Sequence, residues 1–121
     1  MFLATVSKPQ HLLYVCFAGH VGVAELERGR GDLDQLLAEL PPGFRLLTDL
    51  SRLESMDVAC AKEIGKVMER CEQKGVGLVV RVIPDPAKDI GMSLLSIFHY
   101  RRQPRTVICQ TLVEAAQRLG L

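Results

Sequence analysis

The sequence contains no apolar run near the roughly 20 residues that a membrane-spanning helix requires. Its first residues, MFLATVSKPQH, lack the basic segment and long apolar stretch of a signal peptide. The sequence also has no large excess of charge of either sign, because its 15 basic and 14 acidic residues leave a net charge of +1. No global attraction therefore favours nucleic acid or an anionic membrane, and we expect a cytoplasmic protein that binds neither.

Motifs for metals and nucleotides are missing as well. The three histidines are scattered and the sequence has no Cys-x-x-Cys, which argues against a metal site. Neither G-x-G-x-x-G nor G-x-x-x-x-G-K is present, so we expect no nucleotide and no other cofactor. The four cysteines, Cys16, Cys60, Cys71 and Cys109, lie in apolar patterns and are predicted to be buried free thiols, as in a reducing compartment.

The bulk composition predicts a single folded domain over residues 1–121. A chain of 121 residues can bury a core without metals or disulfides. Its 48% apolar and 24% charged residues are ordinary for a globular protein. No internal repeat, linker or low-complexity segment interrupts it.

The periodicity of apolar residues predicts the order β-β-α-β-α-β-α-β-α. Residues 1–7 and 11–19 form the predicted N-terminal strands, and regularly spaced leucines predict a helix over 23–40, weakened by Gly29 and Gly31. A second helix is predicted to begin at Asp57 as N-cap and to end before Gly75. The other predicted elements are strands at 44–50, 76–83 and 105–110 and helices at 85–100 and 111–120. This order indicates an α/β fold with a mixed, mostly parallel five-stranded sheet, helices packed on it and the antiparallel N-terminal strand near an edge.

One stretch resembles a known family. In LLTDLSRLESMD, residues 46–57, Asp49 ends a strand and Asp57 precedes a helix, while Gly19 lies before the first helix. These residues and the element order resemble the STAS domain, the fold of SpoIIAA-like anti-sigma factor antagonists and of cytoplasmic parts of anion transporters. The resemblance implies a bacterial, non-catalytic signalling module whose partner is an anti-sigma factor, a kinase-like protein or another STAS protein, with a homodimer as a further option.

The phosphorylation site of that family is replaced here. The antagonists carry Ser-Ser-Gly or Thr-Ser-Gly after the second aspartate, and a cognate kinase phosphorylates the first hydroxyl. This chain has Val58, Ala59 and Cys60 at those positions. Valine has no hydroxyl, so control by phosphorylation is excluded at residue 58. Ser51 and Ser55 lie in the same predicted loop and could be modified instead, although their offset from the helix differs from the family's. The alternative is that they are ordinary loop serines that hydrogen-bond their own backbone.

The partner surface is predicted around the 51–62 loop and the second helix. Lys62, Lys66 and Arg70 recur every four residues and are predicted to form a basic ridge along one helix face. An ordinary solvated face is the alternative for this ridge. The residues predicted to contact the partner are Ser55, Asp57, Val58, Lys62, Lys66 and Arg70.

A second basic cluster lies further along the chain. Arg101, Arg102 and Arg105 follow Tyr100 closely and suit a phosphate or an acidic partner segment. A polar connection between a helix and a strand would have the same composition.

Two other functions remain open from the sequence. Residues 92–100 could form a lid over an apolar pocket beneath residues 90–98, which would suit a carrier or sensor of a lipid-like ligand. A thiol-dependent enzyme would use Cys60, because the first turn of a helix can lower a thiol pKa. The sequence offers no general base for it, so we expect no catalytic residue and no enzyme activity.

Overall fold

The computed structural model describes residues 1–83 and 104–121. The strands are β1 (Phe2–Ser7), β2 (Leu12–Val21), β3 (Arg45–Met56), β4 (Leu78–Val82) and β5 (Arg105–Cys109), and the described helices are α1 (Val23–Ala38), α2 (Cys60–Lys74) and α4 (Leu112–Leu119). The strands form one sheet in the order β1-β2-β3-β4-β5. β1 pairs antiparallel with β2 and every other pair is parallel. The predicted mixed sheet and its antiparallel edge strand are therefore confirmed, while the helix predicted at 85–100 falls outside the described residues.

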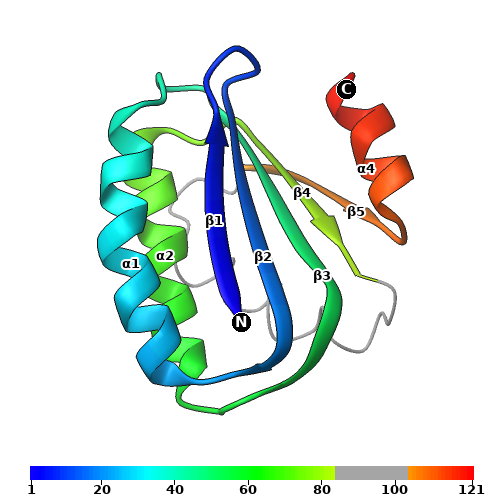
Figure 1. The fold of residues 1–121 in the computed structure, drawn as a ribbon. Coiled ribbons are helices and arrows are strands. Elements are labelled where there is room, and N and C mark those ends of the chain that lie inside the picture. The colour runs from blue at the N-terminus through cyan, green and yellow to red at the C-terminus, as the bar shows by residue number, and fades with distance from the viewer. Residues whose placement is uncertain (84–103) are drawn as a thin grey trace.

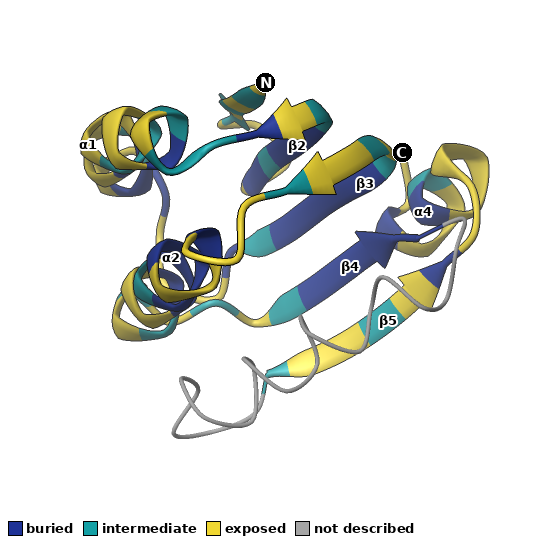
Figure 2. Cartoon of the chain, turned by 90° about the horizontal axis from the view of Figure 1, so that it is seen from below, coloured by how far each residue is buried: buried dark blue, intermediate teal, exposed yellow. Residues whose placement is uncertain are grey.

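Helices cover both faces of the sheet. Figure 1 shows α1 and α2 side by side against one face and α4 on the opposite side. The buried sides of α1 and α2 face the sheet in Figure 2, because the apolar residues of each helix form a single stripe. Alternate residues of the central strands point to the two layers: Leu46 and Leu50 belong to the core under α1 and α2, whereas Leu47 belongs to the smaller core under α4.

The N-terminal hairpin fits closely against α1. The turn between β1 and β2 is closed by a hydrogen bond from the His11 N–H to the Lys8 carbonyl, at 3.1 Å. Gly29 lies against the Phe2 ring, and a Cβ at residue 29 would overlap ring atoms. This glycine was predicted only to weaken the helix; its lack of a side chain lets α1 approach β1.

The loop predicted at residues 51–62 is wrong over residues 51–56, because β3 continues to Met56. Two bulges hide this continuation in the sequence. One lies where Leu50 and Ser51 face Phe17, and the other makes Glu54 the extra residue between the pairs Gly19–Leu53 and His20–Ser55. A bulge adds a residue to one strand, so the core-facing side chains cease to alternate. β2 also runs past Gly19 to Val21, with Gly19 at a positive φ of 63° that favours glycine.

The start of α2 also differs from the prediction. The helix begins at Cys60 with Ala59 as N-cap, and Asp57 does not cap it. The Asp57 carboxylate pairs with His20 instead, and its backbone carbonyl accepts the Cys60 N–H at 2.9 Å. The predicted ends at Gly75 and Gly120 are confirmed, and Thr111 caps α4 by accepting the Glu114 N–H at 3.1 Å.

In the described part of the chain, no helix has the length and apolar character needed to cross a membrane.

Candidate functional site

Three polar side chains meet where β2 and β3 end. Nδ1 of His20 lies 2.7 Å from the Ser55 hydroxyl, and Nε2 of the same ring lies 3.1 Å from Oδ1 of Asp57. The second bulge places Ser55 opposite His20 in the parallel pair. His20 and Asp57 have side chains 57% and 52% exposed, and Ser55 is exposed too. A histidine thus connects a hydroxyl and a carboxylate at the surface.

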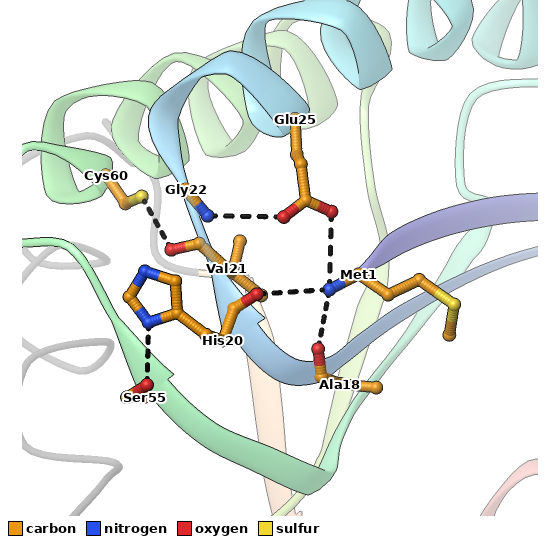
Figure 3. A network of polar contacts seen from close by, with 8 residues as sticks. All are labelled: Met1, Ala18, His20, Val21, Gly22, Glu25, Ser55 and Cys60. Carbon is orange, nitrogen blue, oxygen red and sulfur yellow. Dashed lines mark hydrogen bonds and ion pairs between the residues drawn. The ribbon is translucent and has the colours of Figure 1, made fainter.

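Backbone contacts hold this end of β2 in place. The Met1 amino group donates to the Ala18 carbonyl at 2.6 Å and the His20 carbonyl at 3.4 Å, and it pairs with Glu25 at 3.3 Å. Glu25 also accepts the Gly22 N–H, and that hydrogen bond together with the Met1 amino group lowers the pKa of the Glu25 carboxyl. Figure 3 shows how these groups surround the backbone that carries His20.

The turn between β3 and α2 exposes a valine. Val58 is 92% exposed. Two hydrogen bonds tie the ends of this turn to β2. The Val21 carbonyl accepts one from the Asp57 N–H at 3.2 Å and one from the Cys60 thiol at 3.5 Å. The apolar side chain of Val58 therefore projects from a constrained turn with polar neighbours.

Cys60 does not have the environment of a reactive thiol. Its side chain is fully buried, and burial raises the pKa of the thiol, assisted by the nearby Asp57 carboxylate. The sequence hypothesis of a thiol activated by the helix dipole is therefore wrong, because desolvation favours the neutral form. All four cysteines are buried free thiols, as predicted.

The predicted basic ridge on α2 is largely neutralised. Lys66 is half-buried and its Nζ lies 3.2 Å from Glu63. Arg70 is exposed but donates to both Asp34 carboxylate oxygens, at 2.8 and 2.9 Å. Lys62 is also exposed. Two of the three predicted cations thus have acidic partners, and Lys62 lies nearest the turn in sequence.

A second polar cluster lies beneath the first bulge of β3. The buried Asp49 carboxylate accepts hydrogen bonds from the Tyr14 hydroxyl at 3.0 Å, the Ser51 N–H at 2.9 Å and the Ser51 hydroxyl at 2.6 Å. Burial and the contact with Asp49 raise the pKa of Tyr14. This cluster satisfies polar groups at the bulge and is therefore structural.

The arginine cluster and the lid lie mostly outside the described residues. Arg101, Arg102 and residues 90–100 belong to the undescribed part, while Arg105 opens β5 and is exposed. Between the sheet and α2 there is a cavity of about 30 Å³, whose lining includes Val15, Met68 and the buried Arg81. Its volume is about a tenth of that of the smallest ligand pockets, so it does not favour a carrier of apolar ligands.

The contacts of His20 could not be predicted from the sequence. His20 lies 35 residues before Ser55, and only the pairing of β2 with β3 brings the two together. Among residues 1–83 and 104–121, no group of three or more His, Cys, Asp and Glu side chains could hold a metal ion.

Comparison with known proteins shows the fold. No family model and no curated protein matches the chain. Among solved structures, an uncharacterised protein of the DUF3478 family with a SpoIIAA-like fold, from Shewanella loihica, is 15% identical with a TM-score of 0.74, covering 98% of this chain and 92% of that one. SpoIIAA in its unphosphorylated form is 16% identical with a TM-score of 0.68, over 99% and 98% of the two chains.

An anti-sigma factor antagonist from Mycobacterium paratuberculosis is also similar. It is 17% identical with a TM-score of 0.61, covering 100% of this chain and 94% of that one. The chain therefore has the mixed α/β fold of SpoIIAA, as the sequence resemblance implied. At these identities the likeness concerns the fold.

Proposed function

We propose that the protein is a cytoplasmic, non-catalytic regulatory module that binds a protein partner through its turn surface, defined as Ser55, Asp57, Val58 and Lys62. The partner class is an anti-sigma factor, a kinase-like protein or another STAS protein. Lys66 and Arg70 extend this surface along α2, with their charges already paired. Two antagonists with the same fold support the regulatory class.

The observation that carries the proposal is the exposure of Val58. A side chain that is 92% exposed on a constrained turn contributes little to the core, yet burying a valine in an interface gains about 1.5 kcal/mol or more. Ser55, Asp57 and Lys62 would form a polar rim around this apolar centre, an arrangement common in protein interfaces. Val58 also lacks a hydroxyl, so we propose that phosphorylation at residue 58 does not control binding.

Binding of purified candidate partners tests the proposal. Anti-sigma factors, kinase-like proteins and STAS proteins from the source genome are titrated onto the immobilised wild type, the Val58→Asp variant and the Val113→Asp variant. Val113 is a matched control, because it is a 69% exposed valine on α4. We expect at least one partner to bind the wild type and Val113→Asp equally and Val58→Asp about tenfold more weakly, about 1.4 kcal/mol. Equal binding by the wild type and both variants, or no binding by any of the three partner classes, would contradict the proposal.

A further inference from the structure

The contacts of His20 determine the direction of its hydrogen bonds. Oδ1 of the Asp57 carboxylate lies 3.1 Å from Nε2 of His20, and a negative charge at that distance favours the tautomer that carries its proton on Nε2. In the neutral ring the other nitrogen, Nδ1, then has a free lone pair. The hydroxyl of Ser55, 2.7 Å away, must therefore donate its proton to Nδ1. Asp57 thus selects the tautomer in which His20 is a base towards Ser55.

A hydroxyl that donates to a histidine oriented by a carboxylate is the arrangement that activates serine nucleophiles. We propose that Ser55 is a nucleophilic serine that accepts an acyl group from activated carboxylic esters, with His20 as the general base and Asp57 positioning its ring. Acylation of Ser55 would modify the turn surface covalently, which is distinct from binding a protein partner. The acyl donor approaches from solvent, because His20 and Asp57 are more than half exposed.

The proposed step conserves atoms and charge. Oγ of Ser55 forms a bond to the carbonyl carbon of the ester while its proton moves to Nδ1 of His20. The bond from that carbon to the leaving oxygen then breaks, and the leaving group departs as an alcohol with the proton from His20. The products are O-acyl Ser55 and the free alcohol, with no oxidant or reductant required.

Ser51 provides the contrast within the same strand. Its hydroxyl donates to the Asp49 carboxylate at 2.6 Å, and Ser51 is half-buried. The Asp49 carboxylate already accepts hydrogen bonds from the Tyr14 hydroxyl and the Ser51 N–H. It is therefore poorly suited to take the Ser51 proton during attack on an ester from solvent. Ser51 should therefore remain unmodified where Ser55 reacts.

The test is acetylation of the full chain by p-nitrophenyl acetate. Intact-mass spectra give the extent of acetylation, peptide mapping gives its position, and hydroxylamine separates serine esters from amides on lysine. The variants are Ser55→Ala, Ser51→Ala, His20→Gln and Asp57→Asn, each checked for folding by circular dichroism. A positioned general base accelerates a reaction about 10²-fold or more. Because His20 is exposed to solvent, we expect it to accelerate acylation of Ser55 by at least about tenfold.

The expected result is one ester on Ser55 in the wild type and in Ser51→Ala, and none on residue 55 in Ser55→Ala. His20→Gln and Asp57→Asn should react at least about tenfold more slowly at Ser55. The wild-type and His20→Gln rates at Ser55 should depend differently on pH, because only the wild type has a general base at residue 20. Acetylation confined to amines, or an unchanged Ser55 rate in folded His20→Gln or Asp57→Asn, would overturn the proposal.

Discussion

The Arg30 guanidinium on α1 donates a hydrogen bond to the Glu63 carboxylate on α2 across 2.7 Å, which joins the two helices that cover one face of the sheet. Glu63 is the more buried partner, with a side chain 8% exposed, and Lys66 contacts its other oxygen at 3.2 Å. A carboxylate in this position requires its cations, because the loss of one leaves a poorly solvated charge.

Removing Arg30 should therefore destabilise the protein. Arg30→Ala is expected to lower the free energy of unfolding by about 2 kcal/mol, below the usual 3–5 for a buried pair, because Lys66 remains. Urea denaturation of the purified variant measures this.

The pair between Arg70 and Asp34 is the matched control. Both of these side chains are close to half exposed, so Arg70→Ala should cost no more than about 1 kcal/mol. An equal loss in the two variants would show that burial of Glu63 does not govern the effect.

Two glycines of α1 should respond in opposite ways to alanine. Nothing lies within 4 Å of a Cβ at Gly31, so Gly31→Ala should raise the free energy of unfolding by up to about 1 kcal/mol through helix propensity. A methyl group at residue 29 would overlap the Phe2 ring, so Gly29→Ala should lower it. Thermal unfolding of both variants measures the difference.

The Phe2 ring is the expected cause of the stability loss in Gly29→Ala. In a Phe2→Ala background, Gly29→Ala should lose most of its cost, because the overlapping ring atoms are absent. A penalty that persists unchanged there would show that contact with Phe2 is not the cause.

Buried thiols should make the protein less stable at alkaline pH. Burial raises the pKa of Cys71 from 9.0 to about 12. The stability gained from keeping this thiol neutral is complete below about pH 9 and is lost as the pH rises towards about 12. Within that window one thiol contributes a slope of about 1.4 kcal/mol per pH unit.

Cys71→Ala isolates this contribution. The variant loses packing, yet its free energy of unfolding should fall less steeply than that of the wild type over the same alkaline range. If the free energy of unfolding falls equally steeply with pH in both proteins, the alkaline loss of stability does not come from Cys71. A thiol reagent at neutral pH should also label the native wild type slowly, and all four cysteines should react only after denaturation.

The order of the described strands and helices along the chain was predictable because their apolar residues follow regular periods. The extension of β3 was not, because two bulges place Leu50, Leu53 and Met56 three residues apart, although all three contribute to one core. The apolar residues of this strand then have the three-residue spacing of a helix, in place of the two-residue alternation of a regular strand. Local periodicity cannot reveal such a strand without knowledge of its partner, β2.

The candidate site was also predictable only where its residues are close together in the sequence. Asp57 and Val58 stand at a recognisable position before a helix, so the sequence identified the turn. His20 is distant in the sequence, and its role depends on the register that pairs it with Ser55. Lys66 and Arg70 matched a helical ridge, but their partners Glu63 and Asp34 are known only from packing.

Mapping the partner contact by NMR shows whether the turn surface is where the partner binds. Isotope-labelled protein is titrated with the candidate partner that binds it most tightly, and backbone amide shifts are followed across the chain. The proposal predicts that the largest changes centre on Val58 and extend over residues 55–62, with α4 and Val113 unaffected. Changes centred on α4 or on the β1 edge, with the amides of residues 55–62 unchanged, would contradict it.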